Sequence, residues 1–245
     1  MPETASEEGW REDHSAVFID YGRAFTPERE RQQEIICGLI AAVTPCREVV
    51  ELCCGSGDLA KLLLERLPEM HLKALDGSPR MLAETGETCA RHADRLHLQP
   101  FDLAATDWRD LRPSPDAICS SLAVHHLDGT GKQRLFGDLF AALRPGGLFV
   151  LADLIRPASE AGWRIAAQDW DRAVAARSQG LYGDDRARRR FEELRWNYFR
   201  WPADNGIDHP STLAEHVVWL SAVSFEAVDV HWLLAGHALL SARKP

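Results

Sequence analysis

Residues 49–58 read Val-Val-Glu-Leu-Cys-Cys-Gly-Ser-Gly-Asp. This apolar run predicts a strand that ends in a tight glycine turn, with a helix after it. Because glycine has no β-carbon, Gly55 and Gly57 allow a positive φ and a close approach of a ligand to the backbone. The first turn of the helix would also present free N–H groups. Such a turn is typical of nucleotide-type cofactor sites, but alone it fits dinucleotides, phosphates and adenosyl cofactors equally well.

Strands and helices alternate on both sides of this turn. Further strands are predicted at 71–76, 96–101, 116–122 and 148–153, with a helix at about 130–143. Five alternations predict a doubly wound α/β fold of the Rossmann-like type, in which helices cover both faces of a parallel sheet. Two more strands, 225–231 and 233–242, are expected to add an antiparallel C-terminal hairpin, which gives a seven-stranded sheet.

Acidic residues end two of the predicted strands. Asp76 closes the second strand, nineteen residues after Gly57. From this position a carboxylate accepts hydrogen bonds from both hydroxyls of a ribose. Asp102 follows the third strand, where a carboxylate would accept a hydrogen bond from an adenine amino group. The spacing therefore favours a cofactor that contains adenosine.

A further turn, Leu143-Arg144-Pro145-Gly146-Gly147, precedes the fifth strand. With the glycine turn and the two strand-end acids it makes four ordered motifs within residues 46–155. In this combination the chain resembles the class I S-adenosylmethionine-dependent methyltransferases. The resemblance implies S-adenosylmethionine as the cofactor and S-adenosylhomocysteine as the product. Cys53 departs from the family, which usually has a third glycine there.

The resemblance also implies a set of cofactor-binding residues. The methionine part would lie among Glu51, Gly55 and Gly57, and the ribose would lie against Asp76, Gly77 and Met81. Asp102 and Leu103 would frame the adenine, and Ser121 would lie near the amino acid moiety. The segment 21–25 resembles the lid that many methyltransferases fold over the cofactor, which adds Tyr21; an ordinary packed connection is the alternative.

Two other kinds of nucleotide site fit the motifs less well. The Gly-x-Gly-x-x-Gly pattern of dehydrogenases has Ala60 at its third position, which that pattern allows, so the later motifs decide against a dinucleotide. A phosphate-binding P-loop is excluded because no Gly-Lys-Ser or Gly-Lys-Thr follows the turn.

The composition fits a soluble enzyme with one core and a cap. The chain has 245 residues, of which 45% are hydrophobic, and no apolar run approaches the length of a membrane span. The N-terminus is acidic rather than signal-like, so a cytoplasmic location is expected. Six cysteines without Cys-x-x-Cys spacing predict buried thiols and no metal site. A homodimer is compatible with the sequence.

The net charge of −9 makes a nucleic acid partner unexpected. One local exception is the arginine-rich stretch 184–201, which also contains Trp196 and Tyr198. Arginines interleaved with aromatic residues can bind RNA by stacking and phosphate pairing. The alternative is a solvated helix face whose aromatic rings point into the core.

Four regions follow from these patterns. They are a tail and lid helix (1–45), the cofactor-binding core (46–155), a helical cap (156–210), and a helix and hairpin that complete the sheet (211–245). An insertion at the carboxyl edge of a doubly wound sheet lies beside the ligand crevice. Trp170, Tyr182 and Trp196 of the cap are therefore candidate substrate contacts, although an apolar stripe at helical spacing is usually core.

Methyl transfer requires an aligned nucleophile and a group that removes a proton from it. His125 and His126 follow the fourth strand, where either would act as the base or orient a carboxylate, and Asp153 after the fifth strand is a further candidate. Packing alone is the alternative role for these histidines.

The expected function is methyl transfer to a small aromatic or anionic molecule, with oxygen as the first acceptor atom and nitrogen or carbon as the others. In layout the chain also looks like carboxy-S-adenosylmethionine synthases, although their asparagine at the fourth strand is Ser121 here. A cofactor-binding subunit without catalytic activity is the third alternative.

Overall fold

The structure is a computed structural model that describes residues 10–204 and 206–245. The N-terminal tail expected before Trp10 lies outside the described residues. The described residues form a seven-stranded sheet with the order β3-β2-β1-β4-β5-β7-β6. The strands are β1 (Glu48–Leu52), β2 (His71–Asp76), β3 (Leu96–Pro100), β4 (Ala117–Ser121), β5 (Leu148–Leu154), β6 (Glu226–Leu234) and β7 (His237–Arg243). The first five are parallel, and β7 pairs antiparallel with both β5 and β6, so the predicted fold is confirmed.

Helices cover both faces of this sheet. They are α1 (Glu12–Phe25), α2 (Arg29–Ala41), α3 (Asp58–Arg66), α4 (Pro79–Thr88), α5 (Gly129–Ala142), α6 (Glu160–Tyr182), α7 (Arg186–Glu193) and α8 (Leu213–Ala222). Neighbouring residues of a strand point to opposite faces. Val49 therefore packs with residues of α2 and α3, whereas Val50 packs with residues of α5 and α8.

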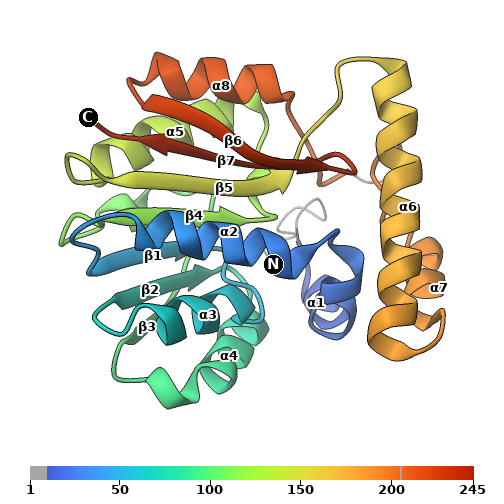
Figure 1. The fold of residues 1–245 in the computed structure, drawn as a ribbon, viewed down its shortest axis with the longest axis horizontal. Helices are drawn as coiled ribbons and strands as arrows, with labels where there is room; N and C mark the ends of the chain where they lie inside the picture. The colour runs from blue at the N-terminus through green and yellow to red at the C-terminus, as the bar shows by residue number, and fades with distance from the viewer. Residues whose placement is uncertain (1–9, 205) are drawn as a thin grey trace, which may run out of the picture.

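A third apolar cluster lies beyond the carboxyl ends of the strands. Figure 1 shows α6 and α7 standing beside the ends of β4 and β5, with α1 between them and the sheet. Phe25 of α1, Trp170 of α6 and Phe191 of α7 are buried together in this cluster. The cap and the N-terminal helix thus form one wall next to the edge where ligands of doubly wound folds bind.

The C-terminal hairpin differs from the prediction in the position of its turn. The sequence suggested a turn near residue 232, but β6 continues to Leu234 and the chain reverses at Ala235 and Gly236. Their φ angles of 53° and 72° fit a two-residue turn of type I′, which needs positive φ at both positions. As a result His237 begins β7, opposite Leu154 at the end of β5.

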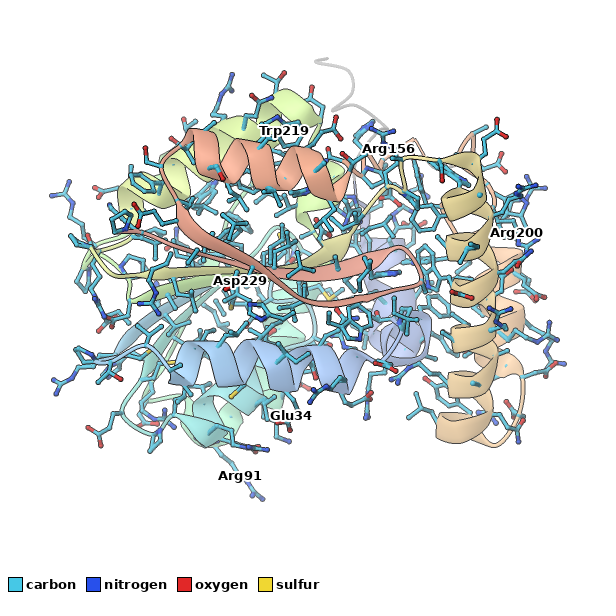
Figure 2. All side chains as sticks on the ribbon, turned by 45° about the horizontal axis from the view of Figure 1, so that its top comes forward. Glu34, Arg91, Arg156, Arg200, Trp219 and Asp229 are labelled. Carbon is cyan, nitrogen blue, oxygen red and sulfur yellow. The ribbon has the colours of Figure 1, made fainter. Side chains whose placement is uncertain are left out.

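The arginine-rich stretch is an exposed, ion-paired surface. Arg186 pairs with Asp184 at 2.7 Å, and Arg195 pairs with Asp204 at 2.8 Å. Arg200 pairs with Asp171, and Figure 2 places it on the outer side of the cap. This arrangement matches the solvated helix face. Among the described residues, no helix combines the length and the apolar character that a membrane crossing requires.

Candidate active site

A cavity of about 520 Å³ runs along the carboxyl edge of the parallel strands, from the ends of β2 and β3 to the end of β5 and the start of β7. We call it the main cavity. Its wall includes Trp10, Phe18, Gly55, Asp76, Asp102, Ser121, His125, Trp196, Asp208 and His237. A smaller cavity of about 20 Å³, lined by Arg29, Glu51 and Gly55 among others, adjoins it. The volume of the main cavity falls in the range of roughly 300–1,000 Å³ that is usual for small-molecule sites.

The glycine turn shapes the floor of both cavities. Cys53, Gly55 and Gly57 all have positive φ, of 58°, 57° and 83°. Gly55 faces the cavities, and a β-carbon there would meet only Phe18 at 3.9 Å. Gly57 lies outside both linings, and its β-carbon would come within 2.9 Å of the Thr85 backbone. Gly57 therefore allows α3 to approach α4 and is not placed at the cavity.

Asp76 and Asp102 lie at the end of the main cavity nearest β2 and β3. The two Asp76 carboxylate oxygens accept hydrogen bonds from the backbone N–H groups of Gly55 and Ser78, both at 2.9 Å. Each oxygen keeps a second lone pair. Burial raises the pKa of Asp76, although these two hydrogen bonds act in the opposite direction. Three more predicted residues line the same region: Gly77, Met81 and Leu103.

The small cavity brings together a buried carboxyl group and a buried guanidinium. Glu51 of β1 is 2% exposed, and its Oε2 has no hydrogen-bond partner among the described residues. Burial raises the pKa of Glu51 to about 8, although the charge of Arg29 opposes the shift. Arg29 of α2, which was not identified from the sequence, forms an ion pair with Asp58 at 3.4 Å. Ser121 lines both cavities and so lies between this pair and the main cavity.

His125 lies between two carboxylates at the other end of the main cavity. Its Nδ1 is 2.5 Å from Asp153, which is fully buried within β5, and its Nε2 is 3.4 Å from Asp208. Burial opposes the charge on His125, but the two carboxylates raise its pKa to about 10. At neutral pH His125 is therefore an imidazolium that donates from both nitrogens. Asp153 lies behind His125 rather than in the cavity wall.

Asp208 was not identified from the sequence, because only the tertiary fold brings its loop to the histidines. The Nδ1 of His126 lies 3.0 Å from the same carboxylate. Lys132, which is fully buried, holds this loop by donating to the carbonyl of His209 and to Ser211. Burial raises the pKa of Asp208, but the charges and hydrogen bonds of His125 and His126 together outweigh it, so that the pKa lies well below its usual range.

His237 is the third histidine of the cavity and was assigned no role from the sequence. Its Nδ1 donates to the carbonyl of Ala235 at 2.9 Å, which leaves Nε2 as the lone-pair nitrogen. Within residues 10–204 and 206–245, the only side-chain hydrogen bond of His237 is this one from Nδ1. Burial lowers the pKa of His237 to about 4, so the ring is uncharged at neutral pH.

The predicted substrate residues divide into two groups. Trp170 and Trp196 line the main cavity. Tyr182 does not, and its hydroxyl donates to the carbonyl of Asp20 of α1 at 2.8 Å. Tyr21, expected at the cofactor, instead has its ring 5.9 Å from those of Phe25 and Tyr182. Trp10 lies just before α1 and Phe18 lies on it; both face the cavity, and neither was identified from the sequence.

His125, His126 and Asp208 each offer one potential metal-ligand atom, and these atoms lie within 4.8 Å of one another. The same atoms make the histidine–carboxylate contacts described above. The expectation that the protein needs no metal stays a prediction.

Comparisons with known proteins agree on one family. Residues 49–147 match the family described as "Methyltransferase domain". A trans-aconitate 2-methyltransferase of Acidovorax ebreus is 32% identical over 148 residues, which cover 59% of this chain and 53% of that protein. A trans-aconitate 2-methyltransferase of Variovorax paradoxus is 30% identical over 130 residues, which cover 53% of this chain and 46% of that protein. The chain thus spans about half the length of the curated relatives it matches.

Solved structures agree on the fold. An O-methyltransferase family 2 protein from Planctomyces limnophilus, in complex with apigenin, superposes with a TM-score of 0.63 at 18% identity. The match covers 94% of this chain and 61% of that one. The glycine turn, the strand-end acids and the family match lead to one conclusion: this chain carries a class I S-adenosylmethionine-dependent methyltransferase domain, and S-adenosylmethionine is its cofactor.

Proposed function

We propose that the protein transfers a methyl group from S-adenosylmethionine to a hydroxyl oxygen of a small molecule held in the main cavity. One observation carries this proposal. The main cavity is continuous from the carboxylates of Asp76 and Asp102 to the histidines beside β5 and β7. It therefore has room beside a cofactor region for an acceptor that meets polar side chains.

The residues present fit the cofactor. Asp76, with a free lone pair on each oxygen, would hold the ribose hydroxyls, and Asp102 would hold the adenine amino group. The unpartnered Oε2 of Glu51 and the guanidinium of Arg29 line the same small cavity. They would bind the ammonium and the carboxylate of the methionine part, respectively. When bound, the cofactor supplies a methyl group on a positively charged sulfur.

His237 is our choice for the group that takes the proton of the acceptor hydroxyl. As the methyl–sulfur bond breaks and the methyl–oxygen bond forms, that proton would move to Nε2 of His237. The hydrogen bond from Nδ1 to Ala235 fixes the tautomer in which Nε2 can accept it. His125 donates from both nitrogens and has no lone pair left for this role. We assign His125, His126 and Asp153 instead to holding Asp208 in the wall.

Helix α1 and the cap would exclude water from the reacting groups. Phe18 lies over the glycine turn, and Trp10 lies between Phe18 and Trp196, with its ring 6.1 Å from each. Apolar walls strengthen the electrostatic interactions that they enclose. This arrangement favours a catalytic site over a subunit that only binds the cofactor.

Isotope tracing tests the proposal. The purified protein would be incubated with S-adenosylmethionine labelled in its methyl group and a protein-free metabolite extract, and labelled products would be identified by mass spectrometry. We expect a labelled O-methyl compound, at least a hundredfold less of it with His237→Asn, and no change with the surface variant His231→Asn.

Other outcomes would point to the alternatives. A carboxylated cofactor in the purified protein would support the synthase, and cofactor binding without any labelled product would support the non-catalytic subunit. A labelled tricarboxylate would extend to this chain the acceptor named for the curated relatives, trans-aconitate.

A further inference from the structure

We propose that the main cavity selects an uncharged aromatic hydroxyl compound as the methyl acceptor and rejects carboxylates. This inference rests on the proposed function and names its substrate class. The acceptor end of the cavity, as we use the term, is formed by Trp10, Phe25, Trp170, Trp196, Asp208 and His237.

Aromatic rings form a connected wall at the acceptor end. The ring of Trp196 lies 6.1 Å from that of Trp10 and 5.2 Å from that of Phe25. Two of the indole N–H groups already have partners. Trp170 donates to the carbonyl of Phe25 at 2.7 Å, and Trp10 donates to Ser15 at 2.8 Å. These rings therefore offer the cavity apolar surface, which suits a flat aromatic molecule.

The same wall has nothing to neutralise an anion. Among the described residues, no lysine or arginine side chain lines the main cavity. The positive charge of His125 is already balanced by Asp153 and Asp208, at 2.5 Å and 3.4 Å. A carboxylate that enters would lose its hydration and approach the Asp208 carboxylate without a cation in return.

The arginines near the cap lie elsewhere. Arg156 and Arg200 are both labelled in Figure 2, and they pair with Glu215 and Asp171. Arg29 faces the small cavity, where the methionine part of the cofactor is proposed to bind. None of the three lines the acceptor end.

A hydroxyl group finds a partner at this end. The Nε2 of His237 carries a lone pair, and the ring stands edge-on to Trp170 with the ring centroids 4.6 Å apart. An aromatic hydroxyl compound that packs against Trp170 can therefore donate its hydroxyl proton to Nε2. A carboxylate has no proton to donate at neutral pH, so it would leave this nitrogen unpaired.

A matched pair of probes tests the inference in the 245-residue chain. The protein would first be saturated with S-adenosylhomocysteine, and calorimetry would then measure the binding of β-naphthol and β-naphthoate, which share a ring system and differ in charge. We expect β-naphthol to bind at least tenfold more tightly than β-naphthoate or trans-aconitate. Equal or tighter binding of either carboxylate would overturn the inference, as would failure of β-naphthol to bind to the saturated protein.

Variants locate the selectivity. Trp196→Ala should weaken the binding of β-naphthol at least fivefold. Trp201→Ala, at a residue that does not line the main cavity, should leave this binding unchanged. Asp208→Asn should reduce the preference for β-naphthol over β-naphthoate, and its loop neighbour Asp204→Asn should not. A preference that Asp208→Asn leaves intact would overturn the electrostatic argument. S-adenosylhomocysteine binding, measured first in each variant, reports separately on folding and on the proposed function.

Discussion

Glu51→Gln should raise the free energy of unfolding of the free protein and weaken its binding of the cofactor. Glu51 is 2% exposed, and burial raises its pKa from 4.5 to about 8. The folded protein therefore holds a proton on this carboxyl at pH values where the unfolded chain has lost it. For such a group the stability is greatest below the unfolded pKa and is lost as the pH rises toward the folded pKa.

The size of the effect follows from the shift. Each unit of pKa difference corresponds to about 1.4 kcal/mol, so ionisation of the unfolded chain lowers the wild-type free energy of unfolding by about 3 kcal/mol at neutral pH. Glutamine resembles the protonated carboxyl and does not titrate. The stability advantage of Glu51→Gln should therefore grow by about 1.4 kcal/mol per pH unit as the pH rises from 5 toward 8.

Urea unfolding of both proteins at several pH values measures this advantage. Glu48→Gln is the control, since Glu48 lies on the same strand with its side chain 40% exposed. The variant should also bind S-adenosylhomocysteine about tenfold to a hundredfold more weakly, because a charge-assisted hydrogen bond contributes about 1.5–3 kcal/mol. A stability difference that does not change with pH, or an unchanged affinity, would refute the reasoning.

Two further predictions concern packing and charge. Gly57→Ala should cost more stability than Gly55→Ala in denaturant unfolding: both positions have positive φ, but only at Gly57 would the new methyl group meet backbone, at 2.9 Å. Gly55→Ala should instead weaken cofactor binding, and the reverse ranking of stabilities would count against these roles. Asp153→Asn should lower the free energy of unfolding by about 3 kcal/mol or more, because it removes one of the two carboxylates beside the buried His125. Since the pKa of His125 is raised to about 10, the stabilisation is complete below its ordinary value of 6.5 and is lost as the pH rises through 10. Denaturant unfolding should therefore show a smaller loss of stability in Asp153→Asn at pH 10 than at pH 6. An equal loss at both pH values would contradict this account of the ion pair.

Much of the proposed cofactor region could be placed at one edge of the sheet from the sequence, because it depends on local order. A strand, a glycine turn and an acid at the next strand end are close in sequence, and the parallel sheet brings their ends to one edge. Asp76, Asp102 and Ser121 accordingly line the main cavity. Gly57 was misplaced because a glycine that permits close packing looks the same in sequence as one that faces a ligand.

The acceptor end was harder to predict because it is assembled from distant segments. His237 was not identified because the position of the hairpin turn was predicted wrongly. Ala235 adopts a φ of 53°, which alanine rarely takes, so the sequence does not indicate a turn there. Asp208 lies in a loop fixed by the buried Lys132, a tertiary contact without a motif. The arginines of the cap attracted attention in the sequence, yet in the fold they pair with neighbouring acids on the surface.

The most direct test of the central claim is a calorimetric titration of S-adenosylmethionine into the wild-type protein and Asp76→Ala, with the exposed Asp94→Ala as the control. If the main cavity holds the cofactor through Asp76, the wild type and Asp94→Ala should bind it at micromolar concentrations and Asp76→Ala should not. No binding by the wild type, or equal binding by Asp76→Ala, would contradict the account.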